Sequence, residues 1–385
     1  MATKTFLSPN RSPFLDALRR SGLLAPAELN AVLAEHSVNP ATDPIQFAAL
    51  LVRKKLLTKF QAMQLLNGRT AGFVLDQYKI LDGIRQDRVG MVFLAEHRET
   101  REKVSIKVLP TDRTADPTIL KAFLQEVRAA AKVDHPNVAR ILDIGYWNGT
   151  HYVVSEYVAA QTFDKVVAAK GPLAPHAAAQ FIAQTALALY AAHQRGLVHR
   201  DVKPGNIAML PDRRVKLLDL GLTHMLENPW TRVTKRISTK EYAEEIAHIA
   251  PEQAWGCEID PRSDVYSLGS TFYFLLTGQV PFPGLAPEMM AQRQIRGVPS
   301  PAALRSSIPK EIDALVRKMG AKDPHERFES AREVVVAMHP WLPVEQWQEL
   351  NLGLPPAAPS VPLPAPDPVA KRGFVSRWFS RLFGR

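Results

Sequence analysis

The chain has 385 residues, enough for two or three domains, and its 46% hydrophobic content is typical of a soluble globular protein. No apolar run approaches the roughly 20 residues that cross a bilayer, and the N-terminal segment MATKTFLSPNRSPF lacks a secretory hydrophobic region. The net charge of +10 comes from the two ends, because residues 73–353 carry 34 basic and 33 acidic side chains. These features predict a cytoplasmic protein without a nucleic-acid-binding core, which would show a basic excess.

Residues 1–72 form the first predicted region, a small helical module. Four segments between residues 12 and 66 have apolar residues at spacings of three and four, interrupted by Gly and Pro, and are predicted as short helices. They are PFLDALRRSGLL, APAELNAVLAEH, DPIQFAALLVRKKLL and TKFQAMQLLNG. The module carries no catalytic motif, so we expect it to have a packing or partner-docking role.

Residues 73–340 form the second region, which has two parts. From Phe73 to about Asp143, β-branched runs such as VGMVFLAEH and EKVSIKVLP predict strands, with one helix near LKAFLQEVRAAAKV. Residues 173–340 are predicted to be mostly helical. An α+β architecture follows, with a strand-rich lobe (73–158), a helical lobe (159–340) and a binding cleft between them. Cys257, the only cysteine, excludes an internal disulfide and a multi-cysteine zinc site, and we expect its thiol to be buried.

The C-terminal part is predicted to be a linker followed by a tail. Residues 341–370 are Pro-rich, which favours an extended, semi-rigid segment. Residues 371–385, KRGFVSRWFSRLFGR, combine an apolar helical stripe with a basic one and contain no acid. This pattern is typical of a helix on an anionic membrane surface, of a helix in a partner's groove, and of a helix folded back on its own protein. The sequence leaves these three alternatives open.

The segment HRDVKPGN, from His199 to Asn206, concentrates polar chemistry in one loop. An acid, a lysine two positions later and an asparagine five positions later supply a proton acceptor, a phosphate-facing cation and a metal ligand. After the strand-like VKLL comes DLG, whose Asp219 is a second acid suited to Mg²⁺. Upstream, Lys107 lies in the strand-like VSIKV and Glu126 lies on the helix that follows. Phosphoryl transfer needs such a set, because its catalysis rests on positioning and on neutralising oxygen charge.

These motifs resemble the protein kinase family, specifically the eukaryotic-like serine/threonine kinases of bacteria. The resemblance covers about Tyr78 to Pro340, and five motifs follow the family's order. They are HRDxKPxN, DxG, APE at Ala250–Glu252, DxYSLG at Asp264–Gly269 and DPxxRF at Asp323–Phe328. The family implies a two-lobed kinase fold, ATP and Mg²⁺ as cofactors, and a protein substrate.

The resemblance also implies roles for single residues. Asp201 would orient the substrate hydroxyl and accept its proton, while Lys203 would neutralise the γ-phosphate. Asn206 and Asp219 would hold Mg²⁺. Lys107, paired with Glu126, would bind the α- and β-phosphates.

Six further positions match the family's framework. The segment SEYV matches the hinge, so the backbone at Glu156 and Val158 would bond the adenine. Ser155 stands at the back of that pocket and is small, which predicts a somewhat larger cavity. Glu252 and Arg327 match a buried ion pair, and Asp264 matches the residue that supports the catalytic loop.

The hairpin YKILDGIRQDRVGMVFLAEH departs from the family's pattern. The three glycine positions of the family fall on Arg85, Asp87 and Gly90, so only the third is a glycine. Glycine lets backbone amides approach phosphates, and Asp87 would bring negative charge close to them. Arg85 would offset that charge by pairing with Asp87 or by reaching a phosphate.

A second departure precedes APE, where the family's threonine falls on Glu245. A carboxylate there would compete for Lys203, repel Asp201, select a basic substrate or hold an inactive state, and the sequence does not decide among these. Further upstream, TRVTKRISTK offers Thr231, Thr234, Ser238 and Thr239 among basic residues. Because Arg200 precedes the catalytic acid, we predict phosphorylation in this segment and a contact to Arg200, with a solvated basic loop as the alternative.

Three functions remain open on the sequence. Retention of every charged catalytic residue favours an active Mg-ATP-dependent serine/threonine kinase. The altered hairpin favours a pseudokinase, a binding or scaffold module with weak phosphoryl transfer. The third alternative is an ATP-using enzyme that acts on something other than protein hydroxyls.

Overall fold

The computed structural model describes residues 13–36, 42–86, 90–110, 114, 116–222, 243–244 and 246–342. The chain divides into two units, Met1–Leu342 and Pro343–Arg385, and every described residue belongs to the first. Predictions that concern Asp87, Glu245, the four candidate phosphorylation sites and the C-terminal tail fall outside the described residues.

The N-terminal module contains the four expected helices. They are α1 (Pro13–Arg20), α2 (Pro26–Glu35), α3 (Pro44–Arg53) and α4 (Lys59–Leu66). A proline at the start of α2 and α3 supplies a preset φ angle where no intrahelical N–H bond is required. The helix α4 begins instead at a capping box in which Thr58 and Gln61 bond each other's backbone N–H groups. The apolar faces form one core around Leu18, Leu51 and Leu65.

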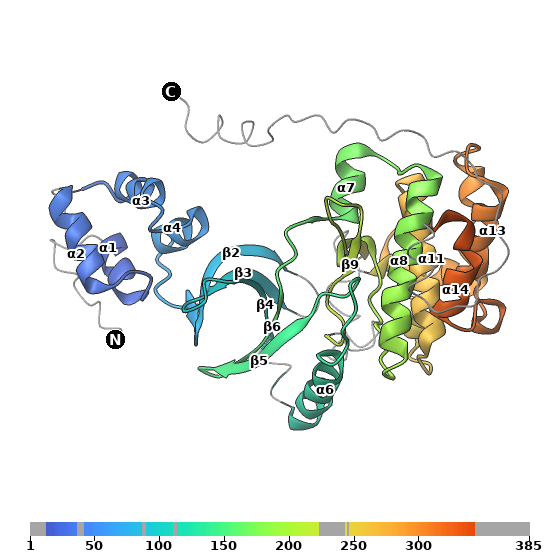
Figure 1. The fold of residues 1–385 in the computed structure, drawn as a ribbon, viewed down its shortest axis with the longest axis horizontal. Helices are drawn as coiled ribbons and strands as arrows, with labels where there is room; N and C mark the ends of the chain where they lie inside the picture. The colour runs from blue at the N-terminus through green and yellow to red at the C-terminus, as the bar shows by residue number, and fades with distance from the viewer. Residues whose placement is uncertain are drawn as a thin grey trace, which may run out of the picture. The chain divides into compact units, whose positions relative to one another are not determined.

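The small lobe is a six-stranded antiparallel sheet with the order β1-β2-β3-β4-β6-β5 (Figure 1). Its strands are β1 (Val74–Leu75), β2 (Tyr78–Gln86), β3 (Met91–His97), β4 (Lys103–Val108), β5 (Ile141–Trp147) and β6 (Thr150–Glu156). The helix α6 (Pro117–Ala130) begins at Asp116, whose carboxylate accepts from two backbone N–H groups of the first turn. Phe123 and Val127 of α6 are buried against Val153 of β6.

The large lobe is mainly helical and has a small sheet, order β7-β8-β9, on the side of the small lobe (Figure 1). Its α-helices are α7 (Phe163–Lys170), α8 (Pro175–His193), α10 (Pro251–Trp255), α11 (Pro261–Thr277), α12 (Ala286–Ile295), α13 (Lys310–Met319) and α14 (Ala331–Ala337). Its strands are β7 (Gln161–Thr162), β8 (Ile207–Met209) and β9 (Val215–Leu217), and its short 3₁₀ helices are η1 (Pro204–Asn206), η3 (Pro301–Ala303), η4 (Pro324–Glu326) and η5 (His339–Trp341). The predicted two-lobed α+β fold is therefore confirmed.

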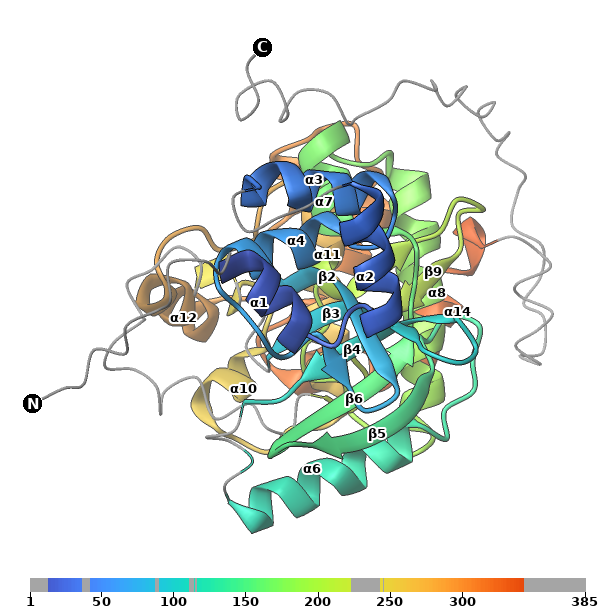
Figure 2. The ribbon, with the colours of Figure 1, turned by 90° about the vertical axis from the view of Figure 1, so that its left-hand side faces the viewer.

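The module contacts the small lobe through α4, which lies beside β2 in both views (Figures 1 and 2). The short edge strand β1 pairs with β2 only at Tyr78 and Lys79. Beyond that point α4 supplies the donors: the Thr58 hydroxyl donates to the Leu81 carbonyl at 2.5 Å, and the Gln61 amide donates to the Ile80 carbonyl at 2.6 Å. The helix thus satisfies backbone groups that the edge of the sheet would otherwise expose.

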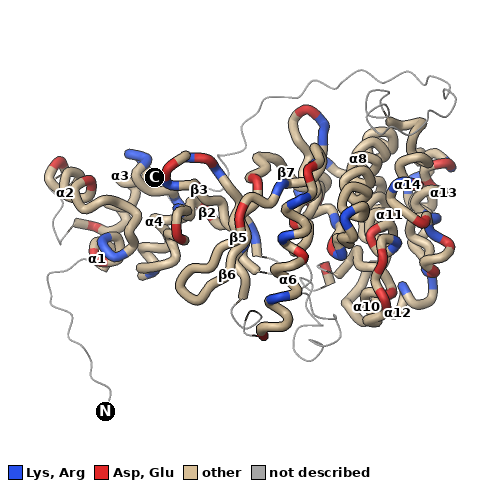
Figure 3. The backbone as a smooth tube through the Cα atoms, turned by 60° about the horizontal axis from the view of Figure 1, so that its bottom comes forward, with Lys and Arg blue, Asp and Glu red and all other residues tan. Residues whose placement is uncertain are grey.

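The described surface is mixed in charge, and one expectation about it was wrong. Positions of Lys and Arg are interspersed with those of Asp and Glu along the described backbone (Figure 3). No helix in the described part of the chain is both long and apolar enough to span a bilayer. Cys257 is exposed, contrary to prediction, because it follows the left-handed Gly256 that ends α10 and lies in the loop before α11.

Candidate active site

A cavity with a volume of about 920 Å³ lies between the two lobes. The hinge borders it, and so do the end of β2 and the loop that contains η1. Its lining includes Arg85, Val92, Ser155, Glu156, Val158, Lys203, Gly205, Asn206 and Asp219. Residues separated by more than a hundred positions in sequence therefore meet at the cleft that the two-lobed organisation predicted.

The catalytic loop holds its polar side chains around Asp201. Lys203 Nζ lies 2.7 Å from Oδ2 of Asp201, and Asn206 Nδ2 donates to the same oxygen at 2.8 Å. Asn206 also donates to the Asp201 backbone carbonyl at 2.8 Å. Because Asn206 uses its NH₂ group in these bonds, its amide oxygen remains as the chemically suitable metal ligand.

Asp264 supports this loop by hydrogen bonds to its backbone, as predicted. Its carboxylate is fully buried and accepts from the backbone N–H groups of His199 and Arg200, both at 2.8 Å. His193 Nε2 lies 2.8 Å from the same carboxylate, a partner that the sequence did not indicate. Burial alone would raise the pKa of Asp264, but the hydrogen bond from His193 and the neighbouring positive charge hold this pKa below its usual range.

Asp219 is the residue of the large lobe that forms ion pairs with two side chains of the small lobe. It follows β9 and has a left-handed backbone with φ of 61°, a strained conformation for a non-glycine residue. Its Oδ2 accepts from Lys107 Nζ of β4 at 2.9 Å and from Arg85 Nη2 of β2 at 2.5 Å. Burial would raise the pKa of Asp219, but the charges of Lys107 and Arg85 outweigh it and lower the pKa.

Arg85 makes two contacts that the sequence did not predict, while its predicted partner Asp87 lies outside the described residues. The two expected partners were Asp87 and a nucleotide phosphate. Besides Asp219, Arg85 donates through Nη1 to the Gly205 carbonyl at 2.8 Å. Asp219 lies 134 residues and Gly205 lies 120 residues further along the chain, so no local sequence signal identifies this bridge.

The predicted pair of Lys107 and Glu126 stays a prediction. Lys107 is buried on β4 and contacts Asp219, while Glu126 lies on α6. Burial raises the pKa of Glu126, and the positive charge of Arg200 partly opposes this rise. The predicted phosphate contact of Arg200 stays a prediction, and in the structure its positive charge acts on Glu126.

One framework prediction can be read directly from the contacts, and the hinge shows one contact that was not predicted. Arg327 forms a bidentate pair with Glu252, at 2.7 and 2.9 Å, and its side chain is fully buried. This confirms the predicted ion pair. At the hinge, Glu156 pairs with Lys216 of β9 at 2.9 Å, a contact between segments 60 residues apart that the sequence did not reveal.

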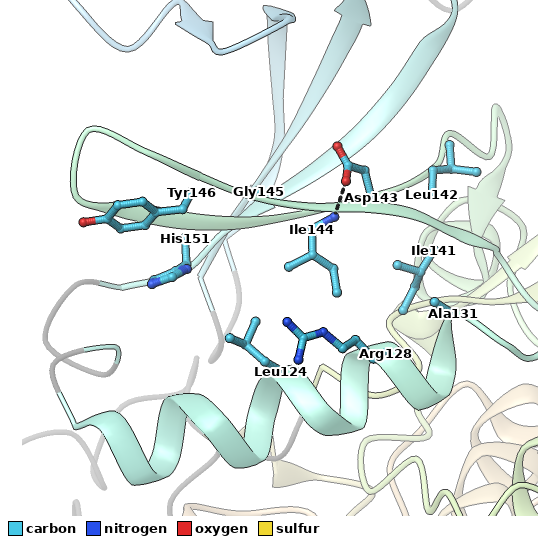
Figure 4. Close-up of a pocket in the computed structure, with 10 residues that line it drawn as sticks. All are labelled: Leu124, Arg128, Ala131, Ile141, Leu142, Asp143, Ile144, Gly145, Tyr146 and His151. Carbon is cyan, nitrogen blue, oxygen red and sulfur yellow. Dashed lines mark hydrogen bonds between the residues drawn. The ribbon is translucent and has the colours of Figure 1, made fainter.

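A smaller cavity of about 430 Å³ lies between α6 and β5 (Figure 4). Leu124 and Arg128 extend from α6 toward Ile144 on β5, and Tyr146 and His151 border one end. None of the predicted catalytic or nucleotide-binding residues lines it. The cavity between the lobes is therefore the candidate active site.

The possible metal ligands of that cavity are few. They suit Mg²⁺, which also takes ligands from water and phosphate, better than they suit a metal ion held by protein side chains alone. No group of three or more His, Cys, Asp or Glu that could hold a metal occurs among the described residues. Asp219 supplies one carboxylate and Asn206 one amide oxygen, while Mg²⁺ usually completes its shell with water and substrate phosphates. The residues present therefore fit a magnesium–nucleotide complex.

Comparison with known proteins agrees with this geometry. The model of the protein kinase domain matches residues 78–342. This chain belongs to the protein kinase family. The kinase is 33% identical over 329 residues to the serine/threonine-protein kinase PknB of Mycolicibacterium smegmatis, an alignment that covers 79% of this chain and 52% of that protein. It is also 33% identical over 259 residues to the serine/threonine-protein kinase PrkC of Bacillus subtilis, covering 67% of this chain and 39% of that protein.

Solved structures give the same result. The kinase domain of Mycobacterium tuberculosis PknI, in a double-mutant form, matches with a TM-score of 0.57 at 26% identity, covering 70% of this kinase and 97% of that chain. The kinase thus spans about half the length of the curated relative PknB and less of PrkC. The family match at residues 78–342 spans the two-lobed domain that contains the candidate site.

Proposed function

We propose that this kinase is a serine/threonine protein kinase that transfers the γ-phosphate of Mg-ATP to a protein hydroxyl. The observation that carries the proposal is the contact of Asp201 with Lys203 and Asn206, which line the cavity, together with the contact of Asp219 with Lys107 at 2.9 Å. These are the charged and polar groups that phosphoryl transfer requires. The bacterial serine/threonine kinases that the chain resembles support the choice of substrate class.

Each residue then has a defined task. Asp201 orients the serine or threonine hydroxyl and accepts its proton as the oxygen bonds to the γ-phosphorus and the bond to ADP breaks. Lys203 stabilises the negative charge on the transferred group. Lys107, together with Glu126, would hold the α- and β-phosphates, and backbone groups at Glu156 and Val158 would hold the adenine. When bound by Asn206 and Asp219, Mg²⁺ supplies neutralisation of phosphate charge.

One observation favours a second candidate, a pseudokinase that binds partners with weak or absent phosphoryl transfer. The ion pair between Arg85 and Asp219 places a fixed cation on the carboxylate that a kinase uses for Mg²⁺. If that ion pair never opens, Asp219 cannot serve the metal.

Phosphate transfer from labelled Mg-ATP distinguishes the two candidates. We expect the full chain to label itself or a generic protein substrate, and we expect Asp201→Asn to lower this rate by about 10²-fold or more, because it removes the proton acceptor. Asp212→Asn is the matched control, since Asp212 is half-exposed on the turn after β8 and pairs only with Arg214 among its described partners. Labelling that is absent from the wild type, or that survives in Asp201→Asn, would overturn the proposal.

A further inference from the structure

We propose that Arg85 is a built-in cationic latch that holds the end of β2 onto the catalytic loop and competes with Mg²⁺ for Asp219. The proposal rests on the proposed function only in treating Asp219 as the metal-binding carboxylate. Arg85 stands at a position where the family has a glycine. In this proposal it regulates access of the metal–nucleotide complex to the cavity between the lobes.

The first argument is the geometry of the bridge. Arg85 is the penultimate residue of β2, and its guanidinium donates both to Asp219 Oδ2 and to the Gly205 carbonyl. The small lobe is thereby joined to two separate segments of the large lobe. A planar guanidinium can serve two acceptors in fixed directions, whereas a lysine ammonium acts as a single flexible charge.

The second argument is the local shape of β2. The pairing of β2 with β3 shifts register between Ile80 and Asp82 and again between Gly83 and Arg85. Such bulges bend a strand and redirect the side chains that follow. The second shift comes immediately before Arg85, and Arg85 lines the cavity between the lobes. The strand is therefore built to direct this side chain into the cleft.

The third argument is electrostatic. Lys107 and Arg85 both bond Oδ2 of Asp219, and the three side chains are only 5%, 24% and 15% exposed, respectively. Water screens charges weakly in such a cleft, so their interactions are stronger than at the surface. A divalent cation that approaches the same carboxylate would meet two positive charges already in contact with it. Mg²⁺ therefore binds more favourably after Arg85 withdraws, which couples metal binding to release of β2 from the catalytic loop.

The latch lowers the apparent affinity for the Mg²⁺–nucleotide complex by a factor that depends on the fraction of molecules in which the Arg85–Asp219 ion pair is open. When only about one molecule in ten has the open site, the apparent affinity for the Mg²⁺–nucleotide complex falls about tenfold. A nucleotide without metal does not need Asp219, so its affinity should respond much less. This difference separates a latch from a residue that merely stabilises the fold.

The latch is tested first without nucleotide, by thermal unfolding of the full-length wild type, Arg85→Gln, Asp219→Asn and the double variant. We expect Arg85→Gln to lower Tm by about 2–4 °C when Asp219 is present and to change it by less than 1 °C in the Asp219→Asn background, because the partner is gone. The control Arg101→Gln removes one exposed charge, paired with Glu96, from the same lobe and should have equal small effects in both backgrounds. Equal effects of Arg85→Gln in both backgrounds would overturn the latch.

Calorimetric titration with a non-hydrolysable ATP analogue then tests competition with the metal. With Mg²⁺ we expect Arg85→Gln to bind about tenfold more tightly than the wild type, and in EDTA to differ by less than twofold, with Arg101→Gln unchanged in both. Unchanged or weaker binding of Arg85→Gln with Mg²⁺, or no binding to any variant, would overturn the competition. The latch would be supported and the proposed kinase activity rejected by one combination of results. In it, the Tm effect of Arg85→Gln depends on Asp219, Arg85→Gln binds the analogue more tightly only with Mg²⁺, and no phosphate is transferred.

Discussion

Replacing Gln61 by alanine is expected to loosen the N-terminal module from the small lobe. Gln61 is buried on α4, where its Nε2 donates to the Ile80 carbonyl at 2.6 Å and its Oε1 accepts from the Thr58 N–H at 2.9 Å. Alanine removes both bonds at once. The Ile80 carbonyl then lies in a buried environment without its side-chain donor, and the start of α4 loses half of its capping box.

The magnitude follows from these two losses. A buried polar group that loses its partner costs about 1–3 kcal/mol, and a weakened helix cap costs about 0.5–1 kcal/mol. We therefore expect Gln61→Ala to lower the free energy of unfolding by about 1.5–4 kcal/mol. The effect should be local as well, with faster hydrogen exchange at the amides of β2, the strand that also carries Arg85.

Urea unfolding and hydrogen exchange measured on the same preparations provide the assay. Gln46→Ala on α3 is the matched control, because Gln46 is exposed and its replacement should change stability by no more than about 0.5 kcal/mol. The reasoning would be refuted if Gln61→Ala were as stable as Gln46→Ala. It would also be refuted if exchange increased throughout the protein without a preference for β2.

Two further predictions concern buried charges of the large lobe. Asp264→Asn should lower the free energy of unfolding, measured in urea, by about 3–5 kcal/mol and should also reduce phosphate transfer. The reason is that an amide cannot accept all three hydrogen bonds that the carboxylate receives. A variant as stable as the wild type would contradict this. The pKa of Glu252 is lowered because the hydrogen bond from Arg327 outweighs burial, so its contribution to stability is present above its ordinary value of about 4.3 and is lost as pH falls through the lowered pKa. The stability difference between wild type and Glu252→Gln should therefore be large at pH 7 and smaller at about pH 3.5 in urea unfolding, and a difference that stayed constant with pH would exclude this account.

The sequence predicted most of what depends on neighbouring residues. The helices α1 to α4 follow from short apolar periodicity and from proline or capping residues at their starts, which act within one turn. The loop around Asp201, Lys203 and Asn206 was predictable because these residues lie within six positions of one another. Their contacts at 2.7 and 2.8 Å show that the three side chains share one loop, as the spacing predicted, although the contacts themselves were not predicted.

Contacts between residues far apart in the sequence could be found only in the tertiary structure. Asp264 could be assigned to the catalytic loop only through the family's pattern, and its partner His193 had no signal at all, since 71 residues separate the two. Cys257 was expected to be buried because of its residue type, but its position after a helix-ending glycine leaves it exposed. Residue type gives an average tendency, whereas exposure depends on what packs above the residue.

The hairpin illustrates the division between the two levels. The sequence by itself determined that Arg85 and Asp87 stand at glycine positions and that the catalytic charges are retained, because both statements concern residue identity and spacing. Only the tertiary structure decided that Arg85 reaches Asp219 and Gly205 across the cleft. That outcome depends on two register shifts in β2 and on the approach of the lobes, and these are properties of strand pairing and packing over more than a hundred residues.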